Sequence, residues 1–428
     1  MKRTIHSILV LCLAIVSGSA LAAPSGLNDK AMDELQAAGV DKYLGTAESK
    51  ASDYGVWTRH EFERKLVPDA EYAPGARADG PVCLTGTPYS VFTRQGDPKK
   101  LLIFMQGGGA CWQNFYNCNP LAELQFPPAV GPFPGVFDPT MPDNPFADYS
   151  VVYMPYCDGS TFGGDNDVKH DPAFLGGQTR YHRGLRNLSA GMDVAGATFP
   201  KAKQITVMGH SAGGVAAAAF APFLARFTFG NNTKLTVYND AGPIAVNLGK
   251  SHSEGGPDIP YLAVAARAND WQFQQFYPQS CIEDGLCNAF GQQTGIIHWR
   301  LANDSTIREA FYETDSDATN RFFAQGDGSR MAPEVYRELI LTEHGALNEA
   351  YPRRYKRFIV SGDDTHGAIQ VTAPSPSFPF AQPFLFYTQE ANGTQLTYWA
   401  GEFVRIGQRQ SKFGWKDIVE DYVPVSNP

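Results

Sequence analysis

A serine at position 211 lies in a setting that is typical of a catalytic nucleophile. The segment Gly209-His210-Ser211-Ala212-Gly213 follows an apolar, strand-like run and precedes an alanine-rich run with helical spacing. A Gly-x-Ser-x-Gly sequence between a strand and a helix forms a sharp turn that holds the serine hydroxyl clear of the sheet. We therefore predict that Ser211 is the nucleophile of an acyl-transfer reaction. The competing interpretation is an ordinary strand-to-helix turn.

A serine hydroxyl needs a base to take its proton, and the base needs an acid to hold its tautomer. The last apolar run, 357–360, leads into a polar loop that contains His366. We expect His366 to be the base because it follows a strand end, where ligands bind in parallel sheets. His210 adjoins Ser211 in sequence, so we expect its side chain to point away and to pack or line the site.

Three aspartates can serve as the acid. Asp304 follows a strand-like run at 296–301 and lies between Ser211 and His366, in the expected order of nucleophile, acid and base. Asp240 follows the preceding strand, and Asp363 is close to the histidine. We predict Asp304, with the other two as rivals.

A glycine run provides candidate donors for an oxyanion. Strand 101–105 leads into Gly107, Gly108 and Gly109, which resemble the glycine-rich loop of esterases and lipases. We expect the backbone N–H groups of Gly108, Gly109 and Ala212 to form the oxyanion hole. A flexible turn and a phosphate cradle are the alternatives, but no Lys-Ser/Thr follows the run as a P-loop requires.

Apolar strands that alternate with helices must position these residues. This order predicts an α/β fold with a mainly parallel central sheet covered by helices on both faces. The predicted strands are 101–105, 149–154, 204–208, 234–238, 296–301 and 357–360, and the predicted helices are 181–198, 212–227, 306–314 and 395–406. We expect one domain over residues 23–428, with an insertion at about 251–294 that caps the site or packs as a helical excursion.

Composition and the first residues indicate export. The chain of 428 residues has 35 Lys and Arg against 44 Asp and Glu, so it is a poor candidate for binding nucleic acid or an anionic membrane. Residues 1–22 have the form of a signal peptide, with Lys2 and Arg3 before an apolar run and Ala20-Leu21-Ala22 at its end. That run is too short for a stable membrane anchor. We expect a secreted or periplasmic protein, and no feature specifies an oligomeric state.

Six cysteines follow the predicted signal peptide, and an even number in an exported chain indicates disulfides. Local pairing would join Cys111 to Cys118 and Cys281 to Cys287, which leaves Cys83 for Cys157. A zinc site is the competing interpretation, but no two cysteines lie two to four residues apart.

Several loop residues are candidates for binding substrate. They are Trp112, Tyr116, Asp158 and Phe162, with simple packing as the alternative. An acidic group of Asp158, Asp165, Asp167 and Asp171 could suit calcium, but its spacing does not match an EF-hand, so we expect a solvated loop and no metal.

Ordered pieces of the chain resemble the pectin acetylesterases, a family that also contains the animal carboxylesterase Notum. The pieces span about residues 81 to 367, some two thirds of the chain. They are Cys83–Pro88, Gly107–Trp112, Tyr156–Gly159, Arg180–Gly184, Gly209–Gly214, Asn239–Gly242, Ala302–Ser305 and the His366 loop.

This resemblance implies an α/β-hydrolase with a triad of Ser211, Asp304 and His366 that acts without a metal or organic cofactor. The implied activity is a serine carboxylesterase that removes O-acetyl groups from a polysaccharide such as pectin. The alternatives are a lipid or polyester hydrolase with a longer acyl pocket, and a non-catalytic carbohydrate-binding protein. Thr306, Thr365 and Gly367 depart from the plant members' pattern, which leaves the choice of substrate open.

Overall fold

A computed structural model describes most of the chain after the predicted signal peptide. The described residues are 26–63, 80–118, 125–128, 135–169, 171–172, 174–243, 268–287, 294–325, 328–369, 385–405 and 414–425. The predicted signal peptide, and positions 251–267 and 288–293 of the predicted insertion, lie outside them.

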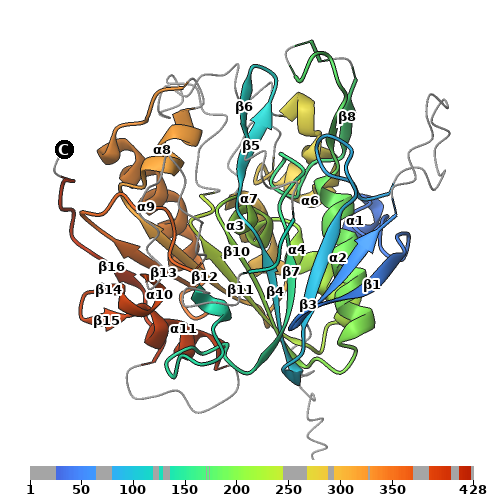
Figure 1. The fold of residues 1–428 in the computed structure, drawn as a ribbon. Coiled ribbons are helices and arrows are strands. Elements are labelled where there is room, and N and C mark those ends of the chain that lie inside the picture. Colours follow the sequence, from blue (N-terminus) through green and yellow to red (C-terminus); the bar gives the residue numbers. More distant parts are fainter. Residues whose placement is uncertain are drawn as a thin grey trace, which may run out of the picture.

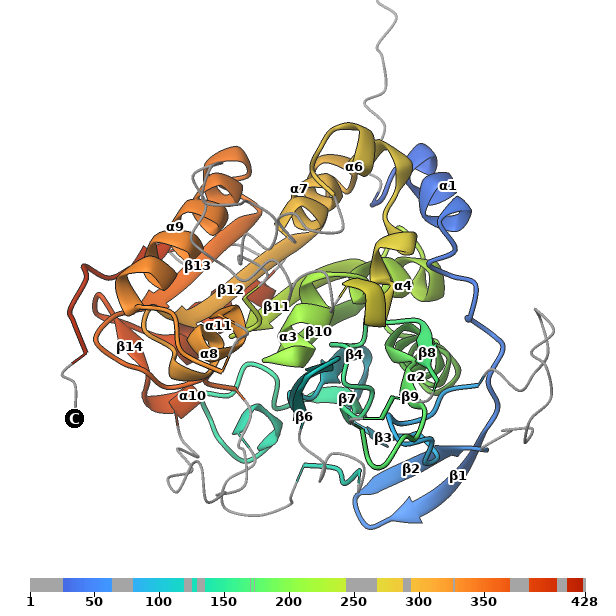
Figure 2. The same cartoon turned by 90° about the horizontal axis from the view of Figure 1, so that it is seen from above.

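A ten-stranded sheet runs through the described part of the chain (Figures 1 and 2). Its spatial order is β1-β2-β3-β7-β4-β10-β11-β12-β13-β16. The strands are β1 (Ser49–Tyr54), β2 (Trp57–Phe62), β3 (Ser90–Arg94), β4 (Asp97–Met105), β7 (Tyr149–Met154), β10 (Gln204–His210), β11 (Lys234–Asp240), β12 (Arg308–Thr314), β13 (Tyr355–Val360) and β16 (Ile418–Val419).

The central strands are parallel, as the sequence predicts. Every neighbouring pair from β7 to β16 is parallel, whereas β1, β2 and β3 pair antiparallel at one edge. Carboxyl ends of parallel strands meet at one edge of a sheet, which is where ligands bind in such folds. The loops after these strands, including the β5–β6 hairpin, lie along the upper edge of the sheet in Figure 1.

Two predicted elements have the wrong type. Residues 296–301 belong to helix α7 (Thr294–Asn303), and the predicted helix at 306–314 is strand β12. Residues 296–301 have a strand-like sequence because most side chains of α7 are buried. The helix therefore lacks the polar face that would identify it in the sequence. The sequence of strand β12 has a helical pattern because two buried glutamates, Glu309 and Glu313, interrupt its apolar residues.

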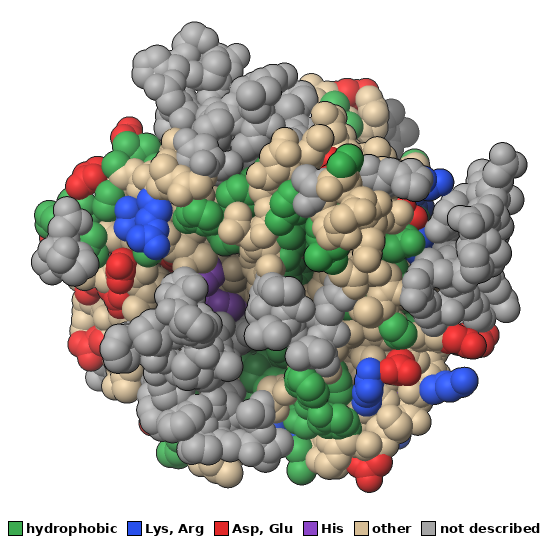
Figure 3. Space-filling model, turned by 45° about the horizontal axis from the view of Figure 1, so that its top comes forward, with side chains coloured by type: hydrophobic (Ala, Val, Ile, Leu, Met, Phe, Trp, Pro, Cys, Tyr) green, Lys and Arg blue, Asp and Glu red, His purple; other side chains and the backbone are tan. Residues whose placement is uncertain are grey.

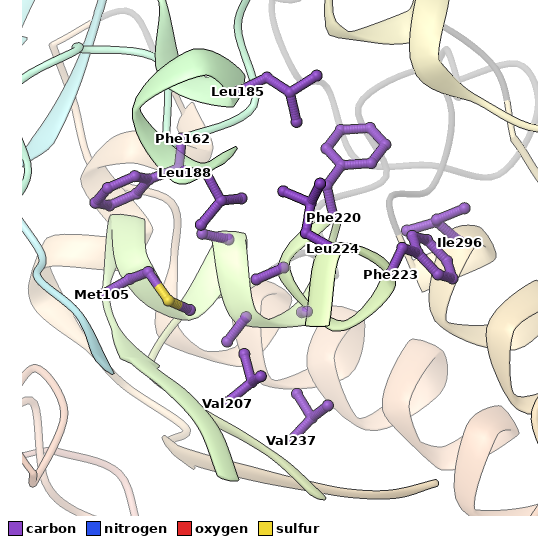
Figure 4. Packing of buried hydrophobic residues seen from close by; sticks show 14 of the residues in the cluster. Met105, Phe162, Leu185, Leu188, Val207, Phe220, Phe223, Leu224, Val237 and Ile296 are labelled. Carbon is purple, nitrogen blue, oxygen red and sulfur yellow. The ribbon is translucent and has the colours of Figure 1, made fainter. Parts of the chain in front are cut away.

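Helices cover both faces of the sheet. Alternate strand residues such as Ile103 and Val207 pack beneath one set of helices, and their neighbours Leu102 and Met208 face the other. The first set comprises α1 (Asp29–Ala37), α2 (Gly184–Thr198), α3 (Ala212–Ala218), α4 (Ala221–Phe229), α7 and α9 (Pro333–Ala350), and the second comprises η3 (Gly135–Phe137), α10 (Leu385–Thr388) and α11 (Leu396–Val404). Figure 4 shows residues of the first core, with Val207 and Val237 below a helix and Phe220, Phe223 and Leu224 above it.

Smaller elements complete the described structure. They are hairpin β5 (Gly109–Trp112) with β6 (Phe115–Cys118), β8 (Asn166–Val168) with β9 (Arg180–His182), β14 (Glu390–Ala391) with β15 (Thr394–Gln395), and helices η5 (Phe273–Phe276), α6 (Gln279–Glu283) and α8 (Ala318–Gln325). Among the described helices, none is by itself both long and apolar enough to span a membrane, and only α3 and α4, bent by 54° to each other, reach that length and composition as a pair.

All three predicted disulfides are confirmed. Cys83 is bonded to Cys157, and the two local pairs at 111–118 and 281–287 are also formed. The Cys83–Cys157 bond joins the segment before β3 to the loop after β7, which carries part of the site described below.

Candidate active site

Ser211 occupies a tight turn between β10 and α3. Its backbone has φ 54° and ψ −120°, a strained conformation for a residue with a side chain. Its N–H donates to the carbonyl oxygen of Asp240 at 2.8 Å, which fixes the turn to the end of β11. The predicted strand, turn and helix around Ser211 are therefore present, and the serine remains partly exposed.

The glycines of the motif are required by close packing. A Cβ atom on Gly209 would lie 2.0 Å from the carbonyl oxygen of Gly213, and one on Gly213 would lie 2.1 Å from that of Met105. Real Cβ atoms do not approach so closely, so the turn needs glycine at both positions. Close contact with Met105 brings the nucleophile turn against the end of β4.

His366 lies beside this turn and binds an aspartate. Its Nδ1 is 2.7 Å from Oδ2 of Asp317, and its ring centroid is 4.9 Å from that of His210, the neighbour of Ser211. The carboxylate of Asp317 is fully buried, whereas the His366 side chain is 16% exposed. The Nε2 atom of His366 makes no hydrogen bond with any described residue, which leaves it free to accept the proton of a serine hydroxyl.

The surroundings of His366 favour its charged form. Burial lowers the pKa of His366, but the charge of Asp317, its hydrogen bond and the charge of Asp240 outweigh burial, so the pKa is raised above the ordinary value. A base in this setting is well matched to gaining a proton during acyl transfer.

The prediction of Asp304 as the acid is wrong. Asp304 precedes β12 and binds Arg226, whose Nε lies 2.7 Å from its Oδ2, whereas Asp317 follows β12 and binds His366. A seven-residue strand separates the two ends of the sheet by roughly 20 Å. The error follows from exchanging the helix and strand types at 296–314.

The rival aspartates have other partners. Asp240 accepts from Nδ1 of His210 at 2.6 Å and from the backbone N–H of Ala368 at 2.9 Å. Asp363 accepts from the backbone N–H of Thr365 at 2.9 Å and so shapes the loop before the histidine. His210 therefore packs within the site, as predicted, and faces Asp240.

The glycine-rich loop lies against the nucleophile. A Cβ on Gly107 would lie 2.8 Å from Cβ of Ser211, and a Cβ on Gly108 would lie 2.4 Å from Cδ1 of Tyr156. Ala212 is the first residue of α3, so its N–H has no acceptor within the helix. The assignment of Gly108, Gly109 and Ala212 as oxyanion donors stays a prediction.

Asp158 and Phe162 do not line the site as predicted. Their side chains are buried, and Asp158 accepts hydrogen bonds from the hydroxyl and N–H of Ser160, within its own loop. Burial raises the pKa of Asp158 to about 6, against the opposing effect of those bonds. The aspartate therefore shapes the loop 156–164 from inside, away from substrate.

The predicted lining residues Trp112 and Tyr116 also have structural partners. The Trp112 ring is 2% exposed and stacks on Phe115 at 4.0 Å between centroids. The hydroxyl of Tyr116 donates to Asp171 at 2.6 Å. Both residues brace the β5–β6 hairpin that carries Gly109.

A pocket along α3 has a different lining, which does not include Ser211 or His366. Val215 and Ala219 follow Ser211 at intervals of four residues, so one face of α3 leads from the serine to the pocket. The remaining lining residues come from the loop after β7, from α4 and α7, and from 268–277: Ser160, Thr161, Gly163, Phe220, Trp271, Phe273, Tyr277 and Ile296. The pocket holds ≈ 360 Å³ of empty space, including the part open to solvent.

Val215 and Ala219 were not predicted as pocket residues, although they follow Ser211 at intervals of four residues, which is the spacing of one helix face. The described part of the predicted insertion, 268–287, does cover this pocket, through Trp271, Phe273 and Tyr277. The indole N–H of Trp271 donates to the carbonyl oxygen of Cys111 at 2.7 Å and so ties the insertion to the hairpin. Figure 3 shows histidine side chains in a hollow on this face of the molecule.

The acidic residues of loop 158–171 are mostly paired with cations rather than solvated as predicted. Asp165 binds Arg186 and Lys42, Asp167 binds Arg183, and Asp171 binds Arg180. Among the residues that the structure describes, no group of three or more His, Cys, Asp or Glu side chains could hold a metal ion.

Comparison with known proteins agrees with this fold. The family model described as Pectinacetylesterase matches residues 62–252, which include the glycine-rich loop and the Ser211 turn. Two crystal forms of the Wnt deacylase Notum from Drosophila have similar folds. One has a TM-score of 0.55 at 14% identity over 86% of this chain and 97% of Notum, and the other has 0.51 at 14% over 75% and 89%.

The family match covers part of the elements on which the site is built. The turn between β10 and α3 and the loop after β4 lie inside the matched family region, whereas β12, β13, Asp317 and His366 follow it in the chain. Residues 62–252 therefore match the pectinacetylesterase family, which is consistent with a carboxylesterase-type hydrolase, and the chain shares the mostly parallel α/β fold of the Notum structures.

Proposed function

We propose that this protein is an exported serine carboxylesterase that uses Ser211, His366 and Asp317 as its triad and removes O-acetyl groups from a polysaccharide such as pectin. The observation that carries the proposal is the buried contact between His366 and Asp317, at the carboxyl end of the sheet and next to the strained Ser211 turn. Asp317, and not Asp304 as predicted from the sequence, is then the acid that holds His366.

The mechanism is acyl transfer in two steps. Ser211 attacks the ester carbonyl carbon while Nε2 of His366 takes the hydroxyl proton, and Asp317 stabilises the resulting imidazolium. Backbone N–H groups of the glycine-rich loop and of Ala212 hold the oxyanion. The alcohol leaves with the proton from His366. Water then attacks the acyl-enzyme by the same route and releases the acid.

The family match and the pocket favour acyl groups of different length. The family description names an acetyl ester of pectin, which supports a short acyl group on a sugar. The pocket along α3 has an apolar and aromatic lining, including Val215, Phe220 and Ile296, which favours a longer acyl chain as the second candidate. The related Notum structure is described as a Wnt deacylase.

Export is supported by the three disulfides, because such bonds persist in oxidising compartments. We therefore propose that the protein is periplasmic or secreted and that residues 1–22 are its signal peptide.

The test is release of acid from acetylated pectin, acetylated xylan, 4-nitrophenyl acetate and 4-nitrophenyl palmitate, with Ser211→Ala as the control. We expect hydrolysis of the acetyl esters by the wild type and a loss of at least about 10³-fold in the variant. A preference for palmitate would replace the acetyl proposal with the lipid one. Equal, negligible rates for both proteins would contradict the esterase and favour the non-catalytic carbohydrate-binding protein.

A further inference from the structure

A second buried carboxyl group lies behind the aspartate that holds His366. Glu313, in β12, is fully buried and lies close to Asp317, whose charge acts on it. Asn320 connects the same two groups, since its side-chain amide lies 3.0 Å from Oε2 of Glu313 and 3.1 Å from Oδ2 of Asp317. The hydroxyl of Tyr336 donates to Oε2 of Glu313 at 2.9 Å. Glu313 thus belongs to a chain of contacts that ends at His366.

Two buried carboxyl groups in contact do not both ionise readily, because like charges repel and burial penalises each charge. Two carboxyl groups can share a hydrogen bond only when one of them carries a proton. Asp317 is the one that faces the imidazole at 2.7 Å and accepts the backbone N–H of Asn320 at 2.7 Å. The negative charge is therefore best placed on Asp317, and the proton on Glu313.

No described cation offsets a charge on Glu313. The arginine of α8, Arg321, donates to the carbonyl oxygens of Ser316 and Met331, and the arginine of α9, Arg337, binds Asp315. The ionisable groups that face Glu313 and its partner come from every neighbouring element: Tyr312 on β12, Asp317 before α8, Tyr336 on α9, His366 after β13 and, through His366, Asp240 after β11. Burial, then the charge of Asp317 and its hydrogen bond, raise the pKa of Glu313 well above its ordinary value.

We propose that Glu313 stays protonated at neutral pH and donates its acid hydrogen to Asp317, so that it is a positioning residue for the Asp317–His366 pair. The inference rests on the proposed function, because it assigns Asp317 to the triad. The proton remains on Glu313 throughout the reaction. As a neutral donor, Glu313 fixes the Asp317 carboxylate without competing for the positive charge that forms on His366.

A pH dependence follows from this role. Loss of the proton at alkaline pH removes the donor and places a second negative charge beside Asp317, so activity falls as Glu313 ionises. Glutamine at the same position keeps an N–H donor at every pH. Glu313→Gln should therefore keep kcat within about threefold of the wild type at neutral pH and lose the alkaline fall.

Two further variants separate positioning from folding. Glu313→Leu removes the donor altogether and should lower kcat by about 10- to 100-fold with little change in KM. Tyr336→Phe removes a hydrogen bond that favours the ionised form of Glu313, so the alkaline fall should move to higher pH. Tyr336→Phe leaves Glu313 in place, so its result is interpretable even if Glu313→Leu does not fold.

Glu309→Gln is the matched control. Glu309 is a buried glutamate on the same strand, but it is paired with Arg300 at 2.7 Å near the other end of β12. This variant should lower the melting temperature and leave the shape of the pH profile unchanged.

The experiment measures kcat and KM with 4-nitrophenyl acetate from about pH 5 to about pH 10, with Ser211→Ala subtracted as the blank. A flat alkaline limb in Glu313→Gln with kcat retained supports the proposal. Loss of kcat in Glu313→Gln as large as in Glu313→Leu, or identical alkaline limbs in Glu313→Gln and the wild type, overturns it. Full activity in folded Glu313→Leu also overturns it and leaves the esterase intact, whereas activity retained in Ser211→Ala overturns the proposed function itself.

Discussion

Asp304 and Asp317 are both buried aspartates, but they bind partners of different chemistry. Asp304 forms an ion pair with Arg226, a cation that stays charged, whereas Asp317 binds an imidazole that gains and loses a proton. The first pair stabilises the fold at the amino end of β12, and the second lies at the carboxyl end beside Ser211. Exchanging their carboxylates for amides therefore distinguishes the two roles.

Asp317→Asn should lower kcat by about 10³- to 10⁴-fold while the melting temperature changes little, because the amide no longer holds the correct tautomer of His366. Asp304→Asn should keep kcat and lower the free energy of unfolding by about 3 kcal/mol, since it leaves a buried guanidinium without its countercharge. Steady-state kinetics and denaturant melts of both variants check this. A large loss of kcat in Asp304→Asn, with kcat retained in Asp317→Asn, would identify Asp304 as the acid.

The pKa of His366 predicts the acidic side of the pH profile. The active form of the base is the neutral imidazole, and the net effect of Asp317 and Asp240 raises the pKa of His366 above its ordinary value. Activity should therefore rise with pH through a midpoint above about 6.5. A profile of kcat/KM against pH measures this midpoint, and a midpoint below that value would contradict the described surroundings of the histidine.

The loop after β13 is held to β11 by hydrogen bonds from its backbone N–H groups to the side chain of Asp240. Asp240 accepts from the N–H groups of Ala368 and Ile369, and Gly367 lies against the ring of His210. A Cβ on Gly367, which has φ +69°, would lie 2.4 Å from Nδ1 of His210 and 2.5 Å from Oδ2 of Asp240. The loop therefore has little room to move without displacing His366.

Gly367→Ala should lower kcat by about 10- to 100-fold, because the loop must shift and carry the base with it. Gly393→Ala is the control, since Gly393 has a similar φ of +71° and a Cβ added there would meet nothing within 4 Å. The control should lose about 1 kcal/mol of stability and no activity. Equal losses of activity in both variants would show that backbone strain alone, and not the contact with His210, is responsible.

The sequence allows the strands around the nucleophile to be predicted, because their apolar runs are uninterrupted and end in turn residues. Strand β7 begins and ends at the predicted residues, and β10 starts where predicted. The sequence misleads at β12 because its two glutamates are buried: Arg300 of α7 pairs with Glu309, and Tyr336 of α9 donates a hydrogen bond to Glu313. Asp317 could have been found from its place before α8, since its Oδ1 caps that helix by accepting the N–H of Asn320.

At the scale of the whole molecule, the disulfides tie loops of the site to the sheet. The Cys83–Cys157 bond joins residues 74 apart in sequence and reaches the loop that lines the pocket, whereas the other two bonds close short loops. A bond that closes a long loop restricts the unfolded chain most.

The double variant Cys83→Ala with Cys157→Ala should lower the free energy of unfolding by about 2 to 5 kcal/mol. The corresponding change at Cys281 and Cys287, which lie six residues apart, should cost less. Denaturant melts of the two double variants beside the wild type check the order. A larger loss at 281–287 would show that the short bond, by holding the segment over the pocket, matters more than loop length.

The central claim is that Ser211 is a nucleophile activated by His366 and Asp317, and active-site labelling tests it most directly. The measurement is the rate and site of covalent modification by a fluorophosphonate, followed by intact-mass and peptide mass spectrometry of the wild type, Ser211→Ala, Asp317→Asn and Asp304→Asn. We predict a single adduct on Ser211 in the wild type, none in Ser211→Ala, slow labelling in Asp317→Asn and wild-type labelling in folded Asp304→Asn. An adduct on another residue, or equal labelling of the wild type and Asp317→Asn, would contradict the account.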